Sequence, residues 1–184
     1  QGCTKEVVCN DGLDDENDGA IDCADSQCAL GCNANVSPCA AGEQMLVLTS
    51  TDVPKTIVDN ATVTSTLTVT EVKTIKRVVM QLNITHTWDS DMAIKLVSPS
   101  GTSLDTSSAN GGSSDNYTST IFNDACATSI TAGAAPFNGC FKPEQAFSAF
   151  NGQAVNGTWK VTVQDTASGD TGSLTTWTLA ICVQ

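Results

Sequence analysis

The sequence predicts an all-β protein, a jelly-roll β-sandwich preceded by a small disulfide-rich segment. Charged side chains make up only 15% of the 184 residues, while Thr, Ser, Asn, Gly and Val are abundant, which favours strands and turns over helices. From Met45 onward, apolar and polar residues alternate in short runs separated by Gly-rich turns. Six of the nine cysteines fall within the first forty residues, where long apolar side chains are scarce.

This change in composition divides the chain into a Cys-rich acidic segment, residues 1–42, and a β-sandwich, residues 43–184. The first part is too short and polar to bury a core, so it needs crosslinks or metal to be ordered. Its cysteine density indicates a disulfide framework and an oxidising compartment, so we expect a secreted, extracellular protein. A zinc site is the alternative, but the chain offers only one histidine, His86. The odd cysteine count leaves one thiol free or paired with another molecule.

The expected strands are identified by apolar residues at every second position. These residues are Val63, Leu67 and Val69; Val78, Met80, Leu82 and Ile84; Met92, Ile94 and Leu96; Trp159, Val161 and Val163; and Trp177, Leu179, Ile181 and Val183. Turn-forming residues separate them at 98–102, 107–116, 151–158 and 168–173. The least regular stretch, 126–150, is expected to be a long loop closed by a disulfide between Cys126 and Cys140.

The charge of the chain excludes two classes of partner. Eight basic residues against 20 acidic ones give a net charge of −12, which repels nucleic-acid phosphates and anionic lipids. No run of about 18 apolar residues is present, so we expect no membrane insertion.

The acidic run DDENDGAIDCAD, residues 14–25, has the spacing of a calcium-binding loop. Calcium takes six to eight oxygen ligands, and a twelve-residue loop supplies them from positions 1, 3, 5, 7, 9 and 12, with Gly at position 6. Counting from position 1, the ligands are Asp14, Glu16, Asp18, the carbonyl of Ala20, Asp22 and Asp25, with Gly19 at the turn. The sequence therefore predicts Ca²⁺ as a structural cofactor.

Two positions depart from the usual calcium loop: Glu16 is longer than the common Asp or Asn, and Asp25 replaces a bidentate Glu. No helical pattern flanks the run, so Cys9 on one side and Cys23 and Cys28 on the other are expected to clamp it. The alternative is a solvated acidic linker. The loop resembles the DxDxDG-type repeats of secreted calcium proteins such as the thrombospondin type 3 repeats.

Four motifs in the second part carry a family resemblance: ITHTW followed by an acidic residue and an apolar strand, SPSGT, NGTWKVTVQD and SGDTGSLTTWTL. Together they resemble the P domain, or Homo B domain, of subtilisin-like proprotein convertases, in the version found in secreted bacterial proteins. The resemblance implies a β jelly roll that supports a protease catalytic domain or contacts an extracellular protein substrate. It also implies a second calcium site, for which the candidates are Asp91, Asp124, Asp165 and Asp170; their alternative role is turn capping.

The residues themselves favour a noncatalytic module. A Ser-His-Asp triad needs a histidine base, and His86 shares a strand face with Ile84 and Trp88, as a hydrogen-bonded core residue would. A glycosidase needs a pair of carboxylates, and no pair is singled out by spacing. A carbohydrate-binding or adhesive module is the alternative, with Trp88 and Tyr117 as surface aromatics, whereas Trp159 and Trp177 are expected in the core.

Overall fold

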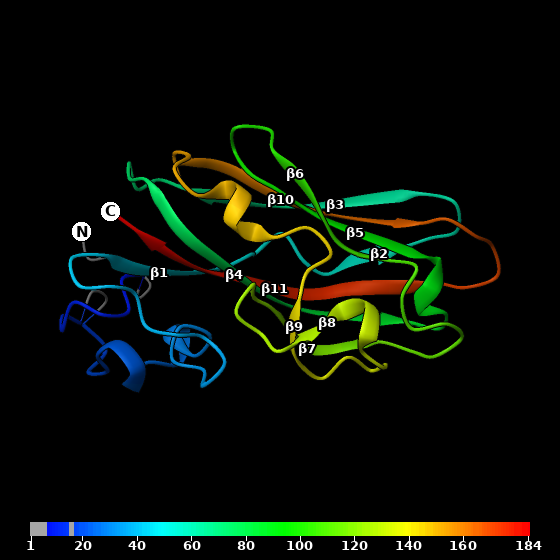
Figure 1. Ribbon diagram of the computed structural model, residues 1–184, viewed down its shortest axis with the longest axis horizontal. Helices are drawn as coiled ribbons and strands as arrows, with labels where there is room; N and C mark the ends of the chain where they lie inside the picture. The colour runs from blue at the N-terminus through cyan, green and yellow to red at the C-terminus, as the bar shows by residue number, and fades with distance from the viewer. Residues whose placement is uncertain (1–6, 15–16) are drawn as a thin grey trace.

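A computed structural model describes residues 7–14 and 17–184, and two β-sheets form its body (Figure 1). The larger, seven-stranded sheet has the order β1-β11-β4-β7-β9-β8, with β2 paired to β11, and the four-stranded sheet has the order β3-β10-β5-β6. The strands are β1 Gln44–Thr49, β2 Lys55–Ile57, β3 Thr62–Val69, β4 Ile75–His86, β5 Met92–Val97, β6 Ser103–Ser108, β7 Tyr117–Phe122, β8 Thr128–Ser129, β9 Gly139–Lys142, β10 Gly157–Asp165 and β11 Gly172–Val183. The prediction of an all-β sandwich is confirmed.

Short 3₁₀ turns are the helical elements of the described chain. They are η1 Asp22–Ala24, η2 Ser26–Cys28, η3 Asp89–Asp91, η4 Ile130–Ala132 and η5 Phe147–Phe150. None of the helices in the described ranges is long and apolar enough to cross a membrane.

The core lies between the two sheets, and two fully buried tryptophans anchor it. Trp159 of β10 and Trp177 of β11 are both 0% exposed. Because a buried indole N–H needs an acceptor, each has one. Trp159 Nε1 donates to the Val155 carbonyl at 3.0 Å, and Trp177 Nε1 donates to Ser65 Oγ at 2.8 Å. Both tryptophans therefore lie in the core, as their strand phase predicts.

Strands with clear alternation match the prediction, whereas strands with other patterns were missed. β1 has consecutive buried residues because Leu46 faces the main core while Met45 and Val47 pack against the N-terminal segment. β6 was missed because its sequence, SLDTSS, is almost entirely polar. The stretch 126–150 is not one long loop as expected: it contains β8 and β9, and β9 pairs in parallel with β7. Parallel pairing leaves no hairpin signal in the sequence.

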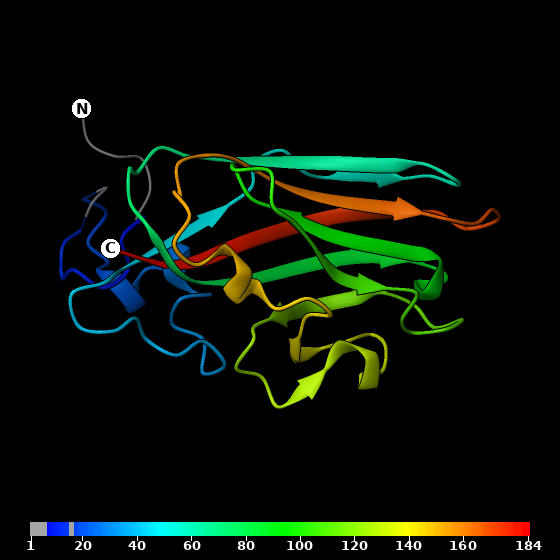
Figure 2. The ribbon, with the colours of Figure 1, turned by 45° about the horizontal axis from the view of Figure 1, so that its top comes forward.

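The described part of the Cys-rich segment packs at one end of the molecule, beside β1 (Figures 1 and 2). Val8 forms an antiparallel bridge with Leu46, and the disulfide Cys39–Cys182 links the segment to β11. A second, smaller apolar cluster lies beneath it, formed by Cys9, Cys28, Leu30, Val36, Met45, Val47, Val79, Ile121, Ala180 and Cys182. The segment thus shares a core with the sandwich across the predicted boundary.

Candidate functional site

The acidic loop is held in a turn by its own carboxylates. Asp14 Oδ1 accepts the N–H of Asp18 at 3.1 Å, and its Oδ2 accepts the N–H of Gly19 at 2.9 Å. Asp18 Oδ1 accepts the N–H of Ala20 at 2.9 Å. Gly19 has a φ of +98°, a conformation that side-chain-bearing residues rarely adopt. The first half of the loop therefore has the sharp turn that the spacing predicts.

The last predicted ligand has an unpartnered carboxylate oxygen. Asp25 is 4% exposed, and its Oδ1 accepts the N–H of Gln27 at 2.6 Å. Its Oδ2 is buried without a hydrogen-bond partner among the described residues. Buried polar atoms are normally satisfied, so this oxygen fits a site that a hard cation completes.

In the described part of the loop, no three of the predicted acidic ligands have side-chain oxygens within 4.8 Å of one another. The carboxylate of Asp22 accepts the N–H groups of Asp11 and Gly12 at 3.2 and 3.1 Å, so it closes the preceding turn. Glu16 lies outside the described residues. Within those residues, the one group that brings three possible ligand atoms within 4.8 Å is Cys39, Glu43 and Cys182, and two of its members form a disulfide.

One disulfide spans the acidic loop, and a second starts from a cysteine within it. Cys9, which precedes the loop, pairs with Cys28, which follows it, and Cys23 pairs with Cys32. The structure also joins Cys126 to Cys140, the pair proposed from the sequence. With Cys39–Cys182, eight cysteines are paired in the described chain, and Cys3 lies outside it. The clamp around the loop is therefore covalent.

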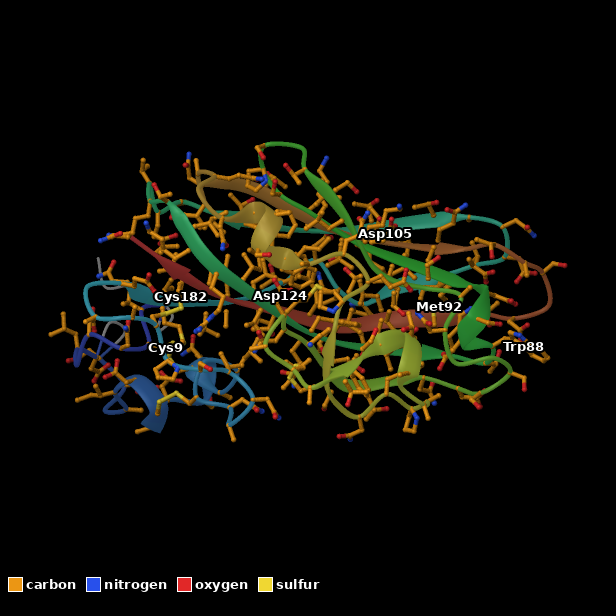
Figure 3. The ribbon with its side chains drawn as sticks, viewed as in Figure 1. Cys9, Trp88, Met92, Asp105, Asp124 and Cys182 are labelled. Atoms are coloured by element: carbon orange, nitrogen blue, oxygen red, sulfur yellow. A yellow bond between two sulfur atoms is a disulfide. The ribbon has the colours of Figure 1, made fainter. Side chains whose placement is uncertain are left out.

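The four carboxylates proposed for a second cation site do not form one cluster, because Asp124 lies apart from the other three (Figure 3). Asp124 accepts the N–H groups of Phe147 and Ser148 at 2.8 and 2.7 Å and so caps η5, far from the end that carries Trp88 (Figure 3). Including Asp124 in one site with the others was wrong, because its strand end belongs to another part of the sheet. The Asp170 carboxylate accepts a hydrogen bond from the Thr87 hydroxyl at 2.8 Å. Asp91 accepts the N–H of Thr166 at 2.8 Å through its backbone carbonyl.

Asp165 belongs to a buried pair with His86. His86 is 1% exposed, and its Nε2 lies 3.2 Å from Asp165 Oδ2. Its Nδ1 lies 3.0 Å from the carbonyl oxygen of Trp88 and 3.2 Å from the Trp88 nitrogen. Both ring nitrogens are thus engaged within the fold, as expected for a hydrogen-bonded core residue.

The close packing around this pair depends on a glycine. A Cβ at Gly172 would lie 2.0 Å from the Thr85 carbonyl oxygen and 2.8 Å from His86 Cδ2. Only a residue without a side chain lets β11 approach β4 at this point.

The predicted pair of surface aromatics is not a pair. Trp88 is 44% exposed, but Tyr117 is 1% exposed, so assigning Tyr117 to a binding surface was wrong. β7 begins at Tyr117 and turns this side chain inward, where it stacks on Phe137 with ring centroids 4.5 Å apart. Its hydroxyl lies 2.9 Å from Ser107 Oγ, and burial raises the pKa of the phenol.

A buried acid beside Trp88 was missed by sequence reasoning. Asp89 is 0% exposed; its Oδ1 accepts the N–H of Asn116 at 2.9 Å, and its Oδ2 has no hydrogen-bond partner among the described residues. Burial raises the pKa of Asp89 to about 7. No sequence signal marks it, because its neighbours in TWDSD look like those of a surface turn.

One groove of the described chain is lined by none of the predicted site residues. It has a volume of about 710 Å³ and runs between the edge strands β1 and β3, where Leu48, Thr49, Leu67 and Thr68 line it. Its one acid, Asp52, is paired with Lys55 at 2.6 Å, and this bond lowers the pKa of Asp52.

These features define a β-sandwich with four disulfides among the described residues and an acidic loop spanned by one of them. Residues 75–181 match the family model described as the proprotein convertase P-domain, and the chain belongs to this family. The resemblance seen in the motifs is thereby confirmed.

The relatives found by comparison are longer proteins. The chain is 26% identical over 175 residues to leupeptin-inactivating enzyme 1 of Streptomyces exfoliatus, covering 95% of this chain and 33% of that protein. It resembles the crystal structure of the serine protease of Aeromonas sobria with a TM-score of 0.54 at 19% identity, covering 85% of this chain and 29% of that one. A crystal structure of the same protease with its chaperone gives a TM-score of 0.48 at 20% identity. The chain thus spans about a third of the curated relative that it matches.

Proposed function

We propose that this chain is a noncatalytic, calcium-binding accessory module of a secreted protein, which stabilises or targets an associated subtilisin-like protease through protein contacts. The observation that carries the proposal is the P-domain match over residues 75–181. The engaged nitrogens of His86 support a noncatalytic role, and the four disulfides support an oxidising, extracellular location. The burial of Tyr117 leaves the carbohydrate-binding alternative with Trp88 alone, so we do not adopt it.

The association with a protease is testable with an activity-based probe. An antibody against this chain isolates the native protein from its source, and a fluorophosphonate labels active serine hydrolases in the isolate. We expect the label on a catalytic domain outside residues 1–184, either in the same polypeptide or in a partner isolated with it. Isolation with a non-immune antibody is the control. Label within residues 1–184, or no labelled protein in the isolate, would contradict the proposal.

The calcium part of the proposal rests on the acidic loop. Asp14, Asp18, the carbonyl of Ala20 and Asp25 would hold the ion, together with Asp22 and Glu16 from the predicted set. Bound calcium would supply positive charge that neutralises the carboxylates, and the protein oxygens that coordinate it would be fixed in place, which would order the loop. The unpartnered Oδ2 of Asp25 and the positive φ of Gly19 support this proposal.

Calcium is expected to raise the thermal unfolding midpoint of the chelator-treated chain. Saturation at a hundred times Kd stabilises a folded protein by about 2.7 kcal/mol. Asp25→Asn keeps the acceptor for the Gln27 N–H but removes a charged ligand, so we expect a several-fold weaker Kd by calorimetric titration. Asp59→Asn, an exposed acid in another loop, is the control. A calcium effect of the same size in Asp25→Asn would place the ion elsewhere and refute the loop site.

A further inference from the structure

Four loops at one end of the sandwich are joined into a single surface, which we call the Trp88 end: residues 58–61, 87–91, 109–116 and 165–171. The Asn60 N–H donates to the Ala167 carbonyl at 3.1 Å, and the Gly169 N–H donates to Asp59 Oδ2 at 3.0 Å. The Asp89 N–H donates to the Ser114 carbonyl at 2.9 Å. Because each loop is hydrogen-bonded to another, the surface is held in one arrangement.

The Trp88 end faces away from the disulfide-linked segment. Figure 3 places Trp88 at one extremity of the molecule and Cys9 and Cys182 toward the other. The described part of the Cys-rich segment therefore leaves this end open to a partner.

An exposed aromatic residue with a fixed backbone lies at this end. The Trp88 backbone is fixed by the Nδ1 of His86 and by the Asp91 N–H, which donates to its carbonyl at 3.2 Å. Trp88 is nevertheless 44% exposed, whereas Trp159 and Trp177 are 0% exposed. A contact made from an ordered backbone costs less conformational entropy on binding, and tryptophan offers a large contact area for a partner.

The same end carries charge of one sign. Its four loops contain six acids and no Lys or Arg: Asp59, Asp89, Asp91, Asp115, Asp165 and Asp170. Asp59 and Asp115 are exposed, and Asp91 and Asp170 are half-buried. Asp89, next to Trp88 in the chain, has a buried carboxylate oxygen without a hydrogen-bond partner among the described residues. Such a field attracts cations, and an indole face adds an attraction for guanidinium or ammonium groups.

We propose that the Trp88 end binds a basic polypeptide segment, with an Arg or Lys side chain against the Trp88 indole and its charge facing the surrounding aspartates. This inference rests on the proposed function and deepens it, because it assigns the contact to a basic loop of the associated protease. A neutral apolar partner would place no positive charge near the exposed acids of this end. The negative charge therefore favours a basic partner.

The binding test uses two synthetic hexapeptides, one with alternating Arg and Gly and one with citrulline in place of each Arg. Calorimetry in chelator should give a measurable Kd for the arginine peptide, and that Kd should rise with salt. Trp88→Ala should weaken binding about tenfold, while Trp88→Phe keeps part of the affinity. Val72→Ala, which removes an 84% exposed apolar side chain outside the four loops, is the matched control and should change nothing. Equal binding of the citrulline peptide, or an unchanged Kd in Trp88→Ala, would overturn the proposal.

A second readout separates this inference from the proposed function. The native protease is captured on immobilised wild-type chain and on the Trp88→Ala variant and is quantified by its fluorophosphonate label. We expect several-fold less capture on Trp88→Ala. Equal capture on both would refute the Trp88 contact but leave the protease association intact. Capture on neither would refute the Trp88 contact with a separate protease, while association within one polypeptide is decided by the fluorophosphonate labelling of the antibody isolate.

Discussion

Replacing Cys39 and Cys182 together by alanine is expected to lower the free energy of unfolding by about 5 kcal/mol. This disulfide joins residues 143 positions apart and ties the Cys-rich segment to the last strand, β11. A crosslink across so long a loop removes much of the conformational freedom of the unfolded chain. Removing it restores that freedom and leaves the segment attached by weaker contacts, such as the Val8–Leu46 bridge and the bond from Arg77 to the Ser37 carbonyl.

The double variant Cys126→Ala/Cys140→Ala is the matched control. Its disulfide closes a loop with a sequence separation of only 14, so the same relation predicts a loss of about 3 kcal/mol. Guanidinium unfolding followed by circular dichroism measures both variants against the parent chain. Equal losses in the two variants would show that loop length does not determine the contribution of Cys39–Cys182.

Asp89→Asn is expected to stabilise the chain above pH 7 and to make its stability less dependent on pH. The pKa of Asp89 is about 7 in the folded protein, against 3.8 as its ordinary value. The folded state therefore holds the Asp89 proton more tightly than the unfolded state does. The stability that this group contributes is fully present below about pH 4 and is lost as the pH rises through 7. A shift of this size corresponds to about 4 kcal/mol, since each pKa unit is worth about 1.4 kcal/mol.

The asparagine keeps the acceptor for the Asn116 N–H, so the substitution removes the charge and little else. Urea unfolding between pH 4 and pH 8.5, in chelator to exclude cation binding, measures the effect. The charges of His86 and Asp115 also influence the pKa of Asp89. The control is Asp59→Asn, which removes a carboxylate at an exposed position and should follow the parent curve. Parallel pH curves for Asp89→Asn and the parent would contradict the raised pKa.

Several strands could be read directly from the sequence because one sheet face is buried and the other meets solvent. β10 shows this clearly: Trp159, Val161 and Val163 are 0% exposed and alternate with more exposed residues. β1 lacked the signal because the Cys-rich segment covers its outer face. Its pairing with β11 depends on a partner more than a hundred residues away, which periodicity cannot reveal.

The candidate sites also contain some features that local sequence predicts and others that depend on distant segments. The turn of the acidic loop, from Asp14 to Gly19, follows from local spacing, because each of its bonds joins residues at most five apart. Asp124 and Tyr117 were misassigned because their surroundings come from distant segments. Asp89 was missed for the same reason, since its burial depends on Asn116 and on Gly111, whose ideal Cβ would lie only 2.7 Å from it.

The sequence by itself therefore determined the all-β class, the P-domain family, the disulfide crosslinking of the N-terminal segment and the local turn of its acidic loop. These properties depend on residue types and on spacings between residues that are close in the sequence. The tertiary structure alone decided how the cysteines of the N-terminal segment pair, which of the two surface aromatic candidates is exposed, and that Asp89 is buried. Each of those outcomes depends on chain segments far apart in sequence being brought together, and burial and pairing energies exist only after that assembly.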